Sequence, residues 1–161
     1  MKFTKVNIGK YNGKTLPEII FTHNDIHWFY NRYYENDFAN NNNLVVEAEY
    51  IFKRLSRIKI PDNMIVEYVV NESQVFKKLV IKNIKAKENN DPDYDVWLRL
   101  EVIDLSFPDQ LMSYRKPHSK RIISYMKKYI FGDKNYKLSK KMSEAFFNDD
   151  NNFDLYFNHN Y

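Results

Sequence analysis

In "RLSRIKIPDNMIVEYVV", residues 54–70, the period of the apolar side chains changes from that of a helix to that of a strand. Residues 44–58, which run into the start of this stretch, place apolar side chains on one helical face, and Pro61 ends the pattern. Residues 64–70 are then almost continuously apolar and rich in β-branched side chains, which is typical of a strand. The change predicts an α+β fold in which helices precede a sheet.

The segment before residue 44 has a helical pattern of its own. From Leu16 to Asn36, apolar and aromatic residues recur at helical spacing, which predicts one or two short helices. We expect a break near residues 22–24, because "THND" offers Thr, Asn and Asp as helix caps. The Asn-rich residues 40–43 are expected to form a loop.

Two further strands are expected after residue 70. Residues 76–87 and 96–105 both have strand patterns, and the turn-forming residues 88–93 lie between them. This order predicts that the two strands pair as an antiparallel hairpin. The apolar set of the second strand shifts from even to odd positions at Ile103, which indicates a bulge or the end of the strand.

The C-terminal part predicts two helices, over residues 119–131 and 138–147, with Gly132 as the stop signal of the first. The expected architecture is therefore a helical module (1–60) followed by a small antiparallel sheet and two C-terminal helices (61–161). The two parts are able to pack as one compact unit.

The composition limits the classes of protein that the chain can represent. With 161 residues, of which 43% are apolar, the chain can bury a core. It has no cysteine, so neither a disulfide framework nor a thiolate metal site is expected, and we expect no cofactor. No signal segment opens the chain and no apolar run approaches the length of a membrane span, so we expect a cytoplasmic protein without a membrane partner.

Two of the three glycines lie in "GKYNGKTL", residues 9–16. Only three residues separate Gly9 from Gly13, so the spacing is not that of a Walker phosphate-binding loop. The Asn12-Gly13 pair is typical of a tight turn, and we expect both glycines to serve the backbone conformation.

This pattern, together with Glu18-Ile19 and the aromatic "DIHWFY" that follows, resembles the small C-terminal module of exodeoxyribonuclease X-like proteins. The resemblance covers residues 6–58. It implies a small helical module that accompanies DNA-processing proteins and is not itself their catalytic part.

The most uneven charge distribution lies between Arg115 and Lys141, where ten basic residues face one acid, Asp133. Solvent-exposed helix faces usually mix both signs, so this excess predicts an anion-binding surface. The candidate nucleic-acid-binding residues are Arg115, Lys116, Lys120, Arg121, Lys127, Lys128, Lys134, Lys137, Lys140 and Lys141, with Lys10 and Lys14 as secondary phosphate contacts.

Two patterns suggest metal chemistry only weakly, and we expect no metal site. His23 and His27 have the spacing of two ligands on one helix face but lack a third ligand. Asp93 and Glu101 resemble part of a metal-dependent nuclease core, but Ile103 stands where that chemistry needs a lysine.

The sequence therefore favours a non-catalytic nucleic-acid-binding protein, with DNA as the favoured partner. The alternative is a protein-interaction module or inhibitor that docks on an acidic surface of a DNA-processing or defence protein. The Asn-, Lys-, Ile- and Tyr-rich composition is similar to that of small phage-encoded proteins, which by analogy would place the protein in the host cytoplasm.

Overall fold

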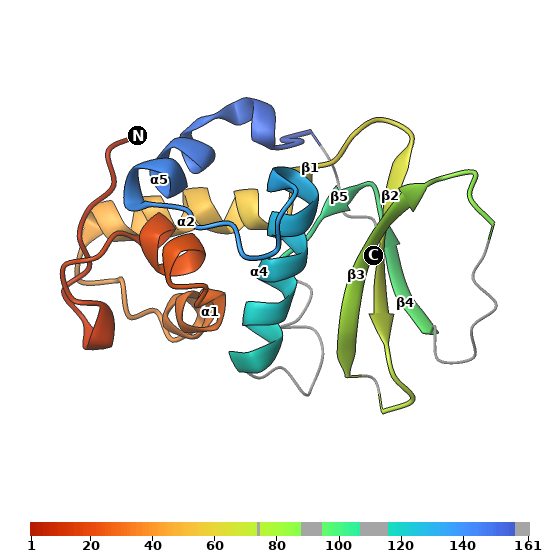
Figure 1. Cartoon of the computed structure of the whole chain (residues 1–161). Helices are drawn as coiled ribbons and strands as arrows, with labels where there is room; N and C mark the ends of the chain where they lie inside the picture. The colour runs from red at the N-terminus through yellow and green to blue at the C-terminus, as the bar shows by residue number, and fades with distance from the viewer. Residues whose placement is uncertain (74, 88–94, 107–115, 157–161) are drawn as a thin grey trace.

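The computed structural model has a helical half and a sheet half, which meet along one long helix, α4 (Lys116–Phe131) (Figure 1). The structure describes residues 1–73, 75–87, 95–106 and 116–156. The helical elements are η1 (Gly9–Tyr11), η2 (Glu18–Thr22), α1 (Ile26–Tyr34), α2 (Asn42–Leu55), α4, α5 (Lys140–Asn148) and η3 (Asp150–Asn152). The α+β class expected from the sequence is confirmed.

The expected helix boundaries are set by side-chain caps and one glycine. Asp25 separates η2 from α1, and its carboxylate accepts a hydrogen bond from the backbone N–H of Trp28 at 3.3 Å. Asn41 and Ser139 cap α2 and α5 in the same way. Gly132 has a φ of +77° and ends α4 in the left-handed conformation that glycine adopts without strain. The break predicted near residues 22–24 is therefore confirmed.

The strands form two small antiparallel sheets. β1 (Ile58–Lys59) pairs with β5 (Val102–Ile103), and the larger sheet has the order β3-β2-β4, formed by β3 (Phe76–Asn83), β2 (Met64–Val70) and β4 (Asp95–Leu100). The shift at Ile103 corresponds to the end of β4 at Leu100 and the start of β5.

The hairpin predicted between β3 and β4 is wrong, because both strands pair with β2 and not with each other. The physical reason lies in the burial of the strands. Residues 66–70 of β2 are all buried, so this strand needs a partner at both edges. β4 alternates exposed and half-buried residues, and β3 has exposed residues at Lys77 and Asn83 and several half-buried ones, so both strands are less buried than β2, which suits the edges of the sheet.

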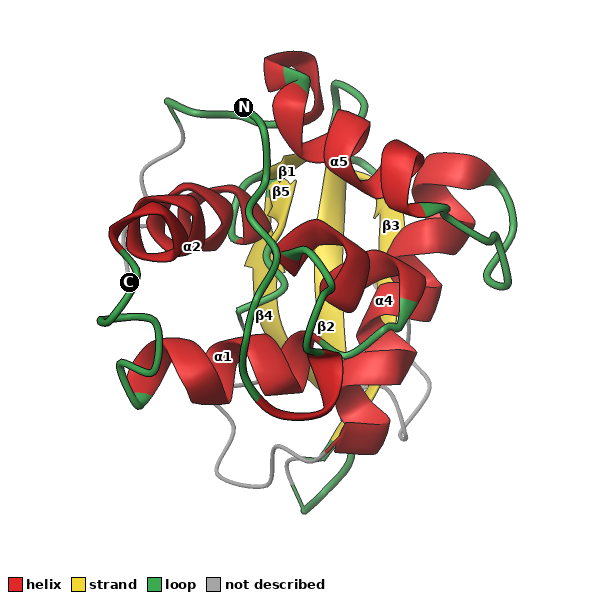
Figure 2. Cartoon of the chain, turned by 90° about the vertical axis from the view of Figure 1, so that its left-hand side faces the viewer, coloured by secondary structure: helices red, strands yellow, loops and turns green. Residues whose placement is uncertain are grey.

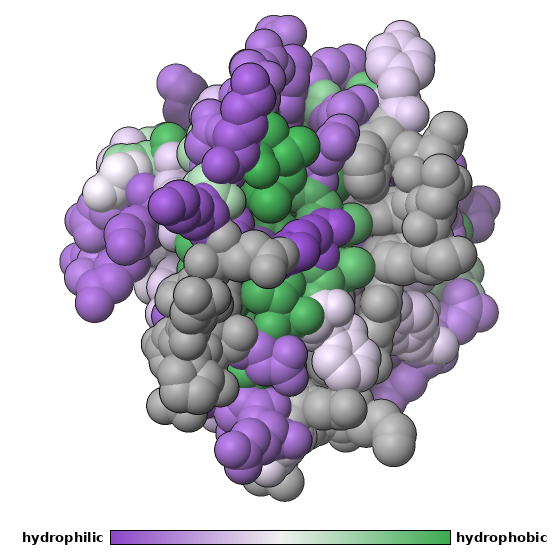
Figure 3. Space-filling view, turned by 90° about the vertical axis from the view of Figure 1, so that its right-hand side faces the viewer, coloured by the Kyte–Doolittle hydropathy of each residue, from purple (hydrophilic) through white to green (hydrophobic). Residues whose placement is uncertain are grey.

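A carboxylate lies on the outer face of this sheet, the face directed away from the helices. Glu67 follows Val66 and precedes Tyr68, both in the core, so its side chain points the other way. It is fully buried and forms ion pairs with Lys82 at 2.9 Å and Arg99 at 2.8 Å. Figure 3 shows that hydrophobic residues gather at the centre of the sheet side of the molecule, with hydrophilic residues around them.

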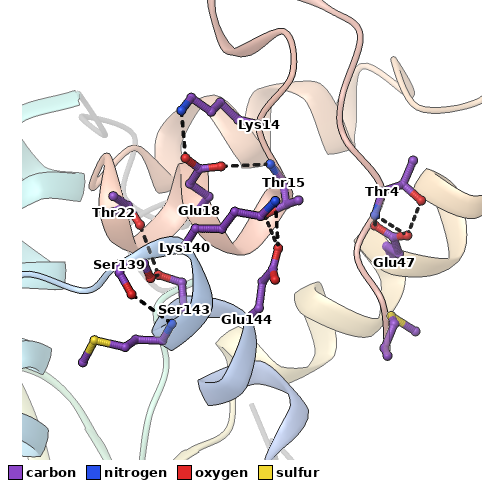
Figure 4. A network of polar contacts seen from close by, with 12 residues as sticks. Thr4, Lys14, Thr15, Glu18, Thr22, Glu47, Ser139, Lys140, Ser143 and Glu144 are labelled. Atoms are coloured by element: carbon purple, nitrogen blue, oxygen red, sulfur yellow. Dashed lines mark hydrogen bonds and ion pairs between the residues drawn. The ribbon is translucent and has the colours of Figure 1, made fainter.

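Long-range polar contacts connect the N-terminal helices to α5 (Figure 4). Thr15 Oγ1 donates to Glu144 Oε1 at 2.9 Å, and the hydroxyl groups of Thr22 and Ser143 lie 3.2 Å apart. One hydrophobic core runs from Phe3 to Phe153 and includes residues of the helices and of the larger sheet. Within the described ranges, no helix is long and apolar enough to cross a bilayer.

Candidate nucleic-acid interface

The "GKYNGK" segment forms a turn that is held by two buried carboxylates. Asn12 has φ −49° and ψ 130°, Gly13 has φ +83°, and the N–H of Lys14 donates to the carbonyl of Tyr11 at 3.0 Å. These values are those of a type II turn, which requires a positive φ at its third residue. The expectation that the glycines serve backbone conformation is confirmed, since Gly9 also has a positive φ, of +59°.

Both lysines of this segment are engaged in ion pairs. Lys10 Nζ lies 2.7 Å from Asp25 Oδ2, to which the hydroxyl of Tyr11 also donates, and Lys14 Nζ lies 2.9 Å from Glu18 Oε1. Burial raises the pKa of both carboxyl groups, but their hydrogen bonds and the lysine charges outweigh it, so each pKa is lowered. Burial and the bond to Asp25 raise the pKa of Tyr11 to about 12. Lys10 and Lys14 therefore brace the loop.

The helix α4 carries three of the predicted basic residues on the side away from the core. Ile122, Ile123 and Met126 are fully buried between the helical half and the sheet. Lys120, Arg121 and Lys128 are exposed on the other side of the helix. Arg121 also donates to the carbonyl of Phe76 at 3.1 Å, which fixes it against the start of β3.

Two adjacent hollows lie along this side of α4. The first has a volume of about 680 Å³ and is lined by Lys120, Arg121, Ser124, Tyr125, Lys128 and residues 132–134. The second, called here the Lys127 pocket, has a volume of about 520 Å³. It lies between three segments and is lined by Thr22 and Asn24 before α1, by Lys120, Ser124 and Lys127 of α4, and by residues 134–138.

The connection from α4 to α5 is held in place by local contacts. Ser124 Oγ donates to the carbonyl of Lys134 at 3.0 Å, and the ring of Tyr136 stacks on that of Phe131 at a centroid distance of 4.7 Å. Asp133 accepts a hydrogen bond from the N–H of Asn135 at 2.9 Å, which stabilises the turn. These contacts hold Lys134 and Lys137 beside α4.

Among the predicted basic residues whose burial the structure describes, Lys127 is the one that the protein buries. Its exposed fraction is 4%, and its Nζ donates to the carbonyl of Phe21 at 2.9 Å and to Asn24 Oδ1 at 2.6 Å. Asn24 has a φ of +52°, a left-handed conformation that asparagine tolerates better than most residues. Burial lowers the pKa of Lys127 to about 8, because neither acceptor carries a full negative charge.

Six cations thus gather in one place. We call them the basic face: Lys120, Arg121, Lys127, Lys128, Lys134 and Lys137. In the part of the chain that the structure describes, none of the six forms an ion pair, and Asp133 is the one carboxylate in the lining of the two hollows. Like charges at this density repel one another, so the basic face favours the binding of an anion.

The acidic C-terminal segment does not neutralise the basic face. Asp150 pairs with Arg54 of α2, whose guanidinium lies over the ring of Tyr50 at 3.6 Å. Asp149 caps η3, and the N–H of Asp154 donates to the carbonyl of Arg57. Phe153 is 4% exposed and docks the segment into the core. The acids of this segment therefore lie against α2, and Figure 2 shows α2 and α4 on opposite sides of the helical half.

Of the predicted residues on α5, neither Lys140 nor Lys141 lines the two hollows. Lys140 lies 3.8 Å from Glu144 on the same helix, and Lys141 is exposed on α5. Lys116 is the first residue of α4, whereas Arg115 lies outside the described residues. The uncharged lining residues Thr22, Asn24 and Ser124 could not be predicted from the sequence, since nothing local in it indicates that these segments meet.

Those residues with metal-binding patterns that the structure describes are not brought into one metal-binding cluster. His23 Nε2 lies 3.9 Å from Glu18 Oε1, and His27 Nε2 lies 3.2 Å from Asn31 Nδ2. Asp93 lies outside the described residues, and Glu101 is exposed between β4 and β5. Among the residues that the structure describes, no three His, Asp or Glu side chains are arranged to hold a metal ion.

Comparisons of the chain with protein-family models, with curated proteins and with solved structures find no match. The resemblance of residues 6–58 to the exodeoxyribonuclease X-like module therefore stays a prediction. A functional conclusion has to come from the site itself.

Proposed function

We propose that this protein binds nucleic acid, with DNA as the favoured form, and that it does so without catalysis through the basic face. The observation that carries the proposal is the gathering of six cations along α4 and the following loop, beside one carboxylate that is engaged in a turn. Lysine and arginine contacts to phosphates give binding that depends little on sequence and strongly on salt. We place this activity in the cytoplasm, in that of the host if the chain is phage-encoded.

The polar lining of the two hollows also supports phosphate contact. Thr22 and Asn135 line the second hollow, so uncharged polar groups lie among the lysines, whereas the hydroxyl of Ser124, which lines both hollows, already donates to the carbonyl of Lys134. The tyrosines of this region contribute less, because Tyr125, Tyr129 and Tyr136 pack against the hydrophobic core. We therefore expect the backbone of the nucleic acid to supply most of the affinity, and base stacking little.

The test compares two triple variants with the same change of charge. The first carries Lys120→Glu, Lys128→Glu and Lys134→Glu, and the control carries Lys2→Glu, Lys5→Glu and Lys53→Glu. All six lysines are exposed, and the control positions lie in the N-terminal segment and on α2. Binding is measured by fluorescence anisotropy with a hydroxyl-ended single strand of about 20 nucleotides, long enough to cover such a face.

At about 0.1 M salt, each phosphate contact contributes about fivefold to single-strand affinity, so the first variant should bind about 100-fold more weakly. The control should stay within a few-fold of the parent. Equal losses in both variants would show that net charge, and not the basic face, governs binding. No binding by the parent would rule out the proposal and leave docking on an acidic protein as the hypothesis to test, by a pulldown for a stoichiometric partner.

A further inference from the structure

The Lys127 pocket differs from the rest of the basic face because one of its cations is built into the protein interior. Lys127 projects from α4 toward the end of η2, where the carbonyl of Phe21 and the side-chain oxygen of Asn24 each accept a hydrogen bond from its ammonium group. An ammonium group has three donors, so one remains for a further acceptor. Burying an ammonium group without a carboxylate partner lowers the stability of the folded protein. Lys127 also lines a pocket of about 520 Å³.

The other charges of the pocket have the same sign. Lys120, Lys134 and Lys137 line it together with Lys127, and no carboxylate of the described residues does. Asp133, the neighbouring acid, lines only the first hollow. Four lysines around one pocket fit a compact anion that carries more than one charge.

The ligand class follows from the shape and charge of the site. A phosphodiester within a strand carries one charge and is flanked by a sugar on each side, so the strand must both enter and leave. A terminal phosphate monoester has one substituent, carries a charge of about −1.5 to −2 at neutral pH and offers three acceptor oxygens. Such a group can enter a pocket between three chain segments and approach Lys127, which is 4% exposed, without the strand having to pass through.

We propose that the Lys127 pocket binds a phosphate monoester at the end of a nucleic-acid strand, with Lys127 as the inner contact and Lys120, Lys134 and Lys137 around it. This inference rests on the proposed function, since the strand itself would lie along the basic face. It makes the protein a reader of phosphorylated ends, whereas the basic face alone would bind any stretch of backbone.

The test uses four probes. Three are single strands of one sequence, which end in a 5′-phosphate, in a 3′-phosphate or in hydroxyl groups at both ends, and the fourth is a nucleoside 5′-monophosphate. Affinities of the parent, Lys127→Met and the control Lys141→Met are measured by anisotropy, and for the mononucleotide by competition. We expect one phosphorylated end to bind the parent at least about tenfold more tightly than the hydroxyl-ended strand, as an added charge-assisted contact allows. Lys127→Met should remove that preference, so that phosphorylated and hydroxyl-ended strands bind it equally, and should lower hydroxyl-ended binding by no more than the roughly fivefold of one phosphate contact. Lys141→Met should keep both the preference and the affinity.

The outcomes separate the pocket from the basic face. Salt-dependent binding of all strands with no preference for a phosphorylated end overturns the pocket inference and leaves the proposed function standing. A mononucleotide that binds as tightly as the phosphorylated strand, and depends on Lys127, supports the monoester site but overturns the strand end as its source. If Lys127→Met fails to fold, Lys137→Met changes an exposed member of the same pocket and should lower the preference about threefold, whereas an unchanged preference contradicts the inference.

Discussion

Replacing Lys127 by methionine should change how the stability of the protein depends on pH. Lys127 has a pKa of about 8 in the folded protein against an ordinary value of 10.5. At about 1.4 kcal/mol for each pH unit, this difference makes the buried charge cost about 3 kcal/mol. The penalty is complete below about pH 8 and is relieved as the pH rises toward 10.5, because in that range the unfolded chain holds a proton that the folded protein has released.

The difference between the parent and Lys127→Met isolates this effect from the other groups that titrate in alkali. At about pH 7 the variant escapes the burial penalty but leaves the acceptors at Phe21 and Asn24 unpaired, so we expect the two proteins to differ by about 1 kcal/mol or less. Between about pH 7 and pH 10 the parent should gain about 2 to 3 kcal/mol relative to the variant. Urea unfolding at several pH values measures both quantities.

Lys128→Met is the matched control, since the neighbouring Lys128 is exposed. Its stability should follow that of the parent at every pH. Parallel curves for the parent and Lys127→Met would refute the reasoning, because they would mean that Lys127 titrates like an exposed lysine.

The other two stability predictions concern the loop before η2. Asp25→Ala should lower the free energy of unfolding by about 2 kcal/mol at neutral pH, since it removes the α1 cap and the partner of Lys10 and Tyr11. The pKa of Asp25 is lowered from 3.8 in the folded protein, so this stabilisation is present above that value and is lost as the pH falls below it. Urea unfolding at about pH 3 should therefore show a smaller difference in stability between the parent and Asp25→Ala. A difference that stays constant with pH would contradict the ion pair. Gly13→Ala should cost about 1 to 2 kcal/mol because φ is +83°, even though the added methyl would meet no described residue other than its chain neighbours within 4 Å. Thermal unfolding of both variants should show a smaller loss of stability for Gly13→Asn than for Gly13→Ala. Equal losses would mean that the loop relaxes to accommodate either side chain.

The local parts of the fold could be predicted from the sequence because they depend on neighbouring residues. The break before α1 follows from Asp25, the end of α4 from Gly132 and the start of α5 from Ser139. The strand order could not be predicted in this way, because residues 88–93 looked like a hairpin turn and the order depends on burial. The nearly continuous apolar run of β2, interrupted by Glu67, was the available signal that it lies between two partners.

The candidate site could be predicted only in part for the same reason. The excess of lysines between residues 115 and 141 indicated where anion binding would lie, and five of the six residues of the basic face remain exposed there. Burial of Lys127 depends on Phe21, which lies 106 positions earlier in the chain, so no local pattern predicts it. Likewise, Asp25 becomes the partner of Lys10 only when the loop closes on it, whereas Glu18, the partner of Lys14, lies only four residues further along the chain.

The most direct test of the account is the dependence of single-strand affinity on salt. The logarithm of the association constant should fall linearly with the logarithm of salt concentration, and the slope should be less steep by about 2 in the Lys120→Glu, Lys128→Glu, Lys134→Glu variant, because three phosphate contacts are lost. The control variant in Lys2, Lys5 and Lys53 should keep the parent slope. An affinity of the parent that hardly changes with salt, or a slope that the three substitutions on the basic face leave unchanged, would contradict the central claim that these cations bind phosphates.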